Sequence, residues 1–152
     1  MELILWRHAE AEPGEPDDGR LLTSKGHKQA VKVGAWLDHN LPTSCKILSS
    51  PTRRTVQTAE ALGRRFKIVP ALATETDPRK LLALTNWPDG REPVLVIGHQ
   101  PALGCIASLL MTGVEQDWPM RKAGVWWFMR KDREGQAFTY LKAVMIPDLL
   151  IK

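Results

Sequence analysis

The sequence contains only two cysteines, Cys45 and Cys105, and neither has another cysteine or a metal-type ligand spacing nearby. We therefore expect no disulfide framework and no cysteine-based metal centre, and we interpret both residues as free, buried thiols. A cysteine nucleophile of the phosphatase-loop type needs an arginine six residues later, but those positions hold Pro51 and Met111. The sequence thus excludes cysteine-dependent phosphatase chemistry.

Two phosphate-binding glycine motifs are also missing, because neither G-x-x-x-x-G-K-[ST] nor G-x-G-x-x-G occurs. Nucleoside-triphosphate and dinucleotide enzymes therefore lack support here. The net charge of +4 and the pI near 9.3 favour anionic partners in general. Nucleic acid is not expected among them, since the sequence has no run of five or more lysines and arginines and no aromatic ladder between basic residues.

No secretory signal is recognisable, because the apolar run at the start of the chain has only four residues and no basic residue precedes it. Residues 93–114 contain no Lys, Arg, Asp or Glu and are about long enough to span a bilayer. Gly98, Pro101 and Gly104 interrupt this segment, which favours a buried strand, a turn and a buried helix instead. We expect a cytoplasmic protein that makes no membrane contact.

The chain is long enough for one compact domain, and we expect this domain to cover residues 1–152. Apolar runs that suit buried strands alternate along it with segments of helical periodicity. This alternation predicts an α/β fold whose sheet becomes mixed at a final hairpin. The expected strands are 3–6, 46–49, 68–69, 94–97, 125–129 and 138–145, and the expected helices run from the Thr23 cap to about Asn40, from Pro51 with Ser50 as its cap to about Phe66, over 78–84 and over 102–111.

Polar residues follow three of the expected strands, namely Arg7 with His8, Ser50 with Arg53 and Arg54, and His99. Because ligands collect beyond the carboxyl ends of strands in open α/β sheets, we expect these groups to meet at one site. Guanidinium groups bind phosphoryl oxygens bidentately, and a helix that opens at Ser50 would add backbone N–H donors. The sequence therefore predicts a cationic pocket that binds an oxyanion.

Two histidines would allow this pocket to transfer a phosphoryl group. Surrounding positive charge disfavours a protonated imidazole, and a neutral imidazole is a competent nucleophile toward phosphorus. His8 can therefore accept a phosphoryl group, while His99 can donate to the equatorial oxygens of the transition state. Attack by water on the phosphoimidazole would release phosphate.

The chain carries, in this order, the motifs R-H-A at 7–9, R-L-L-T-S-K-G at 20–26, S-P-T-R-R at 50–54, Q-T-A at 57–59 and G-H-Q-P at 98–101. This ordered set resembles the histidine phosphatase superfamily, and within it the short SixA-type phosphohistidine phosphatases. The resemblance spans nearly the whole chain. It implies a single histidine phosphatase domain with a three-layer α/β/α fold and a mostly parallel, mixed central sheet, similar to that of phosphoglycerate mutases.

Position by position, the resemblance implies that His8 is the phosphorylated residue and that Arg7, Arg54 and His99 hold the phosphoryl group. Arg54 rather than Arg53 matches the S-P-x-x-R register of the family. Adjacent helical residues point about 100° apart, so only one of these two arginines should face the pocket.

The resemblance assigns further positions as well. Arg20 and Ser50 are implied to bind substrate, and Glu75 is a loose match to the proton donor that larger relatives carry on an inserted segment. Ala9 stands where the wider superfamily has glycine, a change that the SixA-type group tolerates. No metal and no cofactor are expected.

The weak match for a proton donor favours one substrate class. A phosphohistidine releases an imidazole with a pKa near ~6.5, whereas an alkoxide leaving group needs protonation far more. We therefore expect a phosphatase that acts on phosphohistidine in a protein partner, such as a histidine phosphotransfer domain. The alternatives are a small-molecule phosphomonoesterase of the same superfamily and a non-catalytic module that binds phosphate.

Overall fold

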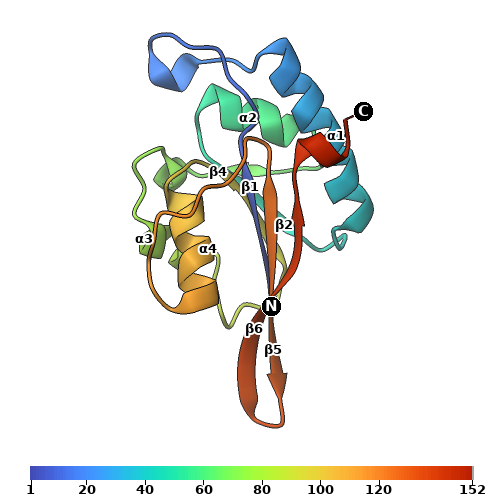
Figure 1. Cartoon of the computed structure of the whole chain (residues 1–152), viewed down its shortest axis with the longest axis vertical. Coiled ribbons are helices and arrows are strands. Elements are labelled where there is room, and N and C mark those ends of the chain that lie inside the picture. Colours follow the sequence, from blue (N-terminus) through green and yellow to red (C-terminus); the bar gives the residue numbers. More distant parts are fainter. Residues whose placement is uncertain (152) are drawn as a thin grey trace.

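The computed structural model describes residues 1–151, which form a six-stranded sheet with helices on both faces (Figure 1). The strands are β1 (Glu2–Arg7), β2 (Lys46–Ser49), β3 (Lys67–Ile68), β4 (Val94–Gly98), β5 (Val125–Arg133) and β6 (Gln136–Met145). The helices are α1 (Ser24–Asn40), α2 (Arg53–Glu60), α3 (Pro78–Leu84) and α4 (Ala102–Thr112), with short 3₁₀ turns η1 (Asp17–Gly19), η2 (Pro70–Leu72) and η3 (Pro147–Leu149).

The strand order is β3-β2-β4-β1-β5-β6. β3, β2, β4 and β1 pair in parallel, whereas β5 pairs antiparallel with both β1 and β6. The expected mixed, mostly parallel sheet is therefore confirmed. Its parallel part places the carboxyl ends of β1, β2 and β4 side by side at one edge.

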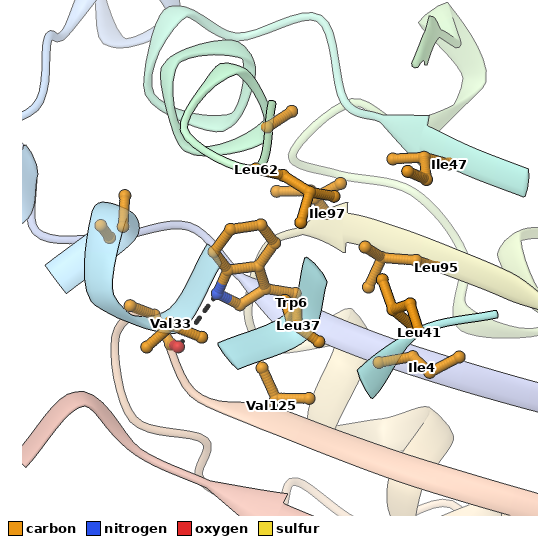
Figure 2. Close-up of a cluster of buried hydrophobic side chains, with 14 of the residues drawn as sticks. Ile4, Trp6, Val33, Leu37, Leu41, Ile47, Leu62, Leu95, Ile97 and Val125 are labelled. Atoms are coloured by element: carbon orange, nitrogen blue, oxygen red, sulfur yellow. Dashed lines mark hydrogen bonds between the residues drawn. The ribbon is translucent and has the colours of Figure 1, made fainter. Parts of the chain in front are cut away.

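Residues of β1 alternate between two apolar cores, which explains why its apolar run is continuous. Ile4 and Trp6 pack with side chains of α1 and α2 on one face, and Leu3 and Leu5 pack with side chains of α3 and α4 on the other. Figure 2 shows Trp6 in the first of these cores, where its indole N–H donates to the carbonyl of Ala123 at 3.0 Å. The sheet thus forms the middle of the three layers.

The predicted start of the second helix is wrong. α2 begins at Arg53 with Thr52 in the N-cap position, so Ser50 and Pro51 both lie before it. The backbone N–H of Ser50 donates to the carbonyl of Ile97 at 3.1 Å, which keeps Ser50 extended beside β4. Sheet pairing therefore overrides the local Ser-Pro helix signal, and the helix also ends at Glu60, earlier than predicted.

Other predictions hold with small differences. The segment 93–114 forms β4, a turn and α4, and within residues 1–151 we find no helix with the length and apolar character that a membrane crossing requires. β5 and β6 extend beyond the rest of the sheet as a hairpin whose turn residues, Glu134 and Gly135, both have positive φ. Cys45 and Cys105 are free, but they are only partly buried rather than fully buried as expected.

Candidate active site

The two histidines lie next to each other because β1 and β4 are paired in register. Arg7 ends β1 opposite Gly98, which ends β4, and the N–H of His8 donates to the carbonyl of Gly98 at 3.1 Å. His8 and His99 follow directly, and their ring centroids are 5.3 Å apart. Both rings are buried, with exposed fractions of 8% and 5%.

His8 has one ring nitrogen paired and one available. Its Nδ1 lies 2.8 Å from the carbonyl oxygen of Ala9, and because this oxygen can only accept, Nδ1 carries the proton. The lone pair of the neutral ring is then on Nε2. Burial, followed by the charges of His99, Arg54 and Arg7, lowers the pKa of His8 to about 3. The imidazole is therefore neutral at physiological pH and has the form of a nucleophile.

The ring of His99 contacts two hydroxyl groups through its Nε2 atom. Its Nε2 lies 2.7 Å from Ser50 Oγ and 3.5 Å from Thr52 Oγ1. Burial and then the charge of Arg54 lower its pKa to about 4. Ser50 itself is fully buried and contacts His99, so its hydroxyl supports that ring instead of capping α2.

The two adjacent arginines of α2 have different environments. Arg54 is 4% exposed, whereas Arg53 is on the solvent side of the helix. Nη1 of Arg54 donates to the Asp17 carbonyl at 2.8 Å, and Nη2 donates to Oδ2 of Asp17 at 3.1 Å. As the geometry of a helix requires, only one of the pair points inward.

The side chain of Arg7 is held by a segment that lies much later in the sequence, just before β5. Its Nη1 donates to the carbonyl of Met120 at 2.7 Å, and burial lowers the pKa of its guanidinium. The segment after Met120 is attached to the same strand end, because the N–H of Ala123 donates to the carbonyl of His8 and the carbonyl of Gly124 accepts from the N–H of Arg7.

Three buried nitrogen atoms have no hydrogen-bond partner among the described residues: Nε of Arg7, Nε of Arg54 and Nδ1 of His99. Buried polar groups in proteins are normally paired, so these exceptions require an explanation. All three belong to residues that the sequence predicts to hold a phosphoryl group. A tetrahedral oxyanion accepts several hydrogen bonds at once and is a partner that such N–H groups can bind.

Asp17 is a site residue that the sequence reasoning missed. Its carboxylate joins Arg54 to Arg20, whose Nη1 lies 3.0 Å from Oδ1 of Asp17. Hydrogen bonds from Arg20 and then from Arg54 lower the pKa of this exposed carboxyl group. Asp17 therefore connects Arg20 to Arg54. The role of Arg20 in substrate binding stays a prediction. The three-residue spacing of Asp17 and Arg20 is the signal that could have pointed to the pair.

The loop after His8 is held by polar side chains whose roles were also not predicted. Thr58 of α2 accepts from the N–H of Ala9 at 3.1 Å and donates to the carbonyl of Arg54 at 2.7 Å. Gln29 of α1 accepts from the N–H of Glu10 at 3.0 Å. These contacts attach both α1 and α2 to the loop after His8.

Glu75 lies exposed between η2 and α3, after the edge strand β3. Within residues 1–151, none of the hydrogen bonds or ion pairs connects it to either histidine or to Arg7 or Arg54. A role for Glu75 as proton donor stays a prediction.

The buried histidines predict a specific pH dependence of stability. Histidines in the unfolded chain bind protons below a pKa of about 6.5, whereas His8 and His99 stay neutral in the folded protein down to far lower pH. Protons therefore favour the unfolded state, and the free energy of unfolding falls as the pH decreases from about 6.5 to about 4, by at most about 1.4 kcal/mol per pH unit for each histidine. Urea denaturation across this window should show a shallower fall for His8→Asn than for the wild type.

The exposed His27 provides a matched control for this measurement. His27→Asn should leave the pH profile of the free energy of unfolding unchanged. Identical profiles for His8→Asn and the wild type would show that His8 is not buried in the neutral form.

Comparison with known proteins gives three findings. The family model of the histidine phosphatase superfamily (branch 1) matches residues 3–79. Phosphohistidine phosphatase SixA of Escherichia coli (strain K12) is 30% identical over 124 residues, which are 74% of this chain and 76% of that protein. The solved structure of the protein histidine phosphatase SixA complexed with tungstate has a TM-score of 0.78 and 27% identity, and the match covers 99% of both chains.

A more distant structure shares the fold alone. It is a phosphoserine phosphatase mutant from Entamoeba histolytica in complex with phosphoserine, with a TM-score of 0.71, 17% identity and 99% of both chains covered.

Proposed function

Because this chain belongs to the histidine phosphatase superfamily, we propose that it is a phosphohistidine phosphatase that works through a covalent intermediate on His8. The observation that carries the proposal is the neutral His8 ring, with its lone pair on Nε2, close to His99, Arg54 and Arg7, each of which has a buried nitrogen without a hydrogen-bond partner among residues 1–151. A nucleophile and an oxyanion-binding set in one place are what phosphoryl transfer needs.

In the first step, Nε2 of His8 attacks phosphorus while the phosphorus–nitrogen bond to the substrate imidazole breaks. The bonding electron pair leaves with the substrate nitrogen, which takes a proton from solvent. Arg7 and Arg54 carry permanent charge and neutralise the phosphoryl oxygens as the loose transition state forms. In the second step, water attacks the phosphorus of phospho-His8, the bond to Nε2 breaks, and phosphate is released with the neutral ring restored.

His99 acts on the phosphoryl oxygens in this scheme. When the hydroxyl of Ser50 donates to Nε2 of His99, the neutral ring carries its proton on the unpaired Nδ1. That N–H can then donate to an equatorial oxygen. The contribution is electrostatic and requires no proton transfer, so the low pKa of His99 does not impair it.

The proposed substrate is phosphohistidine on a protein, such as a histidine phosphotransfer domain. The name of the relative at 30% identity supports the phosphohistidine class. The leaving group supports the same class, because an imidazole with a pKa of about 6.5 departs without a strong acid, and Glu75 is exposed and makes no hydrogen bond to either histidine. Location in the cytoplasm is part of the same proposal.

Substrate choice can be tested by comparing kcat/KM for a phosphohistidine peptide and for a simple aryl phosphate. We expect the wild-type protein to prefer the peptide at least tenfold, a difference of about 1.4 kcal/mol in transition-state stabilisation. Equal or better use of the ester would favour the small-molecule phosphomonoesterase. Phosphate binding without turnover of either compound would favour the non-catalytic module.

A further inference from the structure

A basic cavity lies next to the candidate active site, with Arg7 in its lining. It has a volume of about 260 Å³ and lies between the start of α1, the loop after His8, the segment before β5, and η3. Figure 1 shows this C-terminal turn beside α1. Its charged lining residues are Arg7, Lys25, Arg121 and Lys122, with Glu10 and Asp148. We refer to this space as the basic cavity.

The positive groups of the basic cavity outnumber the carboxylates, and both carboxylates are already engaged. Glu10 accepts from the hydroxyl of Thr23 at 2.8 Å, and Asp148 pairs with Arg121 at 3.3 Å. Lys25 and Lys122 are exposed and take part in none of the ion pairs among residues 1–151. Two cationic side chains are therefore free to bind an anion.

The start of α1 adds to this potential. Lys25 lies in the first turn of the helix, where no acidic residue is present. The first turn of a helix carries unpaired N–H groups and the positive end of the helix dipole, which a carboxylate normally complements. Here the first turn carries a lysine, and the one carboxylate at this helix start is that of Glu10, which accepts from the hydroxyl of the cap residue Thr23.

We infer that the basic cavity binds a carboxylate of the phosphoprotein substrate, close to its phosphohistidine. The inference rests on the proposed function and adds a recognition element to it. Arg7 links the two places, because its backbone ends β1 next to His8 and its side chain lines the cavity. A glutamate one helical turn from the phosphohistidine shares its face of a helix, with Cβ atoms about 5–6 Å apart, and therefore suits a neighbouring site. The cavity has room for one acidic side chain but not for a folded element.

Lys25→Gln combined with Lys122→Gln tests this inference. The probes are two phosphohistidine peptides that differ only in carrying glutamate or glutamine four residues after the phosphohistidine, with free phosphohistidine as a third substrate. Exposed ion pairs contribute little individually, so the wild type should prefer the glutamate peptide by about three- to tenfold in kcat/KM. The double variant should lose this preference and hydrolyse free phosphohistidine at the wild-type rate.

A matched control removes the same charge elsewhere. Lys28 and Lys131 are exposed and do not line the cavity, so Lys28→Gln combined with Lys131→Gln should keep the preference for glutamate. Equal loss in both double variants would show a general effect of net charge and would overturn the inference. The inference would also be overturned if Lys25→Gln combined with Lys122→Gln kept the preference for glutamate. The same holds if glutamate fails to improve turnover at every one of the four positions before and the four positions after the phosphohistidine.

Two further kinds of outcome are informative. One shows whether a protein or a metabolite supplies the carboxylate, and the other shows whether the proposed function or only the role of the basic cavity is contradicted. If the cavity lysines mattered more for a small phosphoester that carries a carboxylate, such as phosphoserine, than for the peptide, a metabolite rather than a protein would supply the group. No turnover of either phosphohistidine peptide or of free phosphohistidine by the wild type would contradict the proposed function itself. Turnover without any glutamate preference would contradict only the role of the basic cavity.

Discussion

His8→Asn is expected to lower turnover of phosphohistidine by roughly 1,000-fold or more, because the variant lacks the Nε2 atom on which the proposed phosphoenzyme forms. The wild type, given a phosphohistidine donor and quenched within one turnover, should carry a phosphoryl label that acid removes and base does not. The variant should carry none. Rapid-quench labelling with a ³²P donor, combined with steady-state phosphate release, measures both quantities.

His39→Asn serves as the control, since His39 is exposed at the end of α1. It should label and turn over as the wild type does. Label that persists in His8→Asn would place the intermediate on another residue. An unlabelled wild type that still releases phosphate would instead indicate direct attack by water, with His8 in a supporting role.

Much of this arrangement is predictable because it depends on local patterns. The apolar runs of β1 and β4 identify buried strands, and parallel pairing then requires that His8 and His99 emerge at the same edge. The periodicity of a helix is enough to decide that only one of Arg53 and Arg54 is buried. These steps need the identity of a few neighbouring residues and the general geometry of α/β sheets.

The remaining features depend on tertiary contacts that leave little trace in the sequence. The anchor of Arg7 is a backbone carbonyl 113 residues away, and every residue type offers the same carbonyl. Asp17 is one of five acidic residues between positions 10 and 18, and its spacing to Arg20 indicates that local ion pair but not the contact with Arg54, 37 residues away. The start of α2 at Arg53 is equally hard to predict, because the N–H of Ser50 bonds to the carbonyl of Ile97 in β4, a contact that the local sequence does not indicate.

The basic cavity is a further case, because three of its walls meet only after folding. Lys25 comes from the start of α1, Lys122 from the segment before β5, and Asp148 from the C-terminal turn. The sequence indicates a positive net charge but not where that charge is concentrated. Only the fold shows that part of this positive charge lies close to His8.

Arg54→Met is the second substitution with a large expected effect, and its neighbour supplies an unusually close control. Arg54 is buried with an unpaired Nε, so its loss removes a preorganised charge from the oxyanion site and should lower kcat/KM by roughly 100- to 1,000-fold. Methionine keeps much of the side-chain length and apolar volume, which limits the disturbance of α2. Arg53→Met changes the same charge at the adjacent, exposed position and should leave kcat/KM within about twofold of the wild type.

The same pair of variants separates binding from chemistry. Arg54→Met should also weaken inhibition by tungstate, a tetrahedral oxyanion, whereas Arg53→Met should not. If the guanidinium of Arg54 binds the phosphoryl group as proposed, Arg54→Lys should recover only part of the lost activity, because lysine restores the charge but not the planar fork. If both methionine variants lost activity equally, the effect would come from the net charge of α2, and Arg54 would have no special place in the oxyanion site.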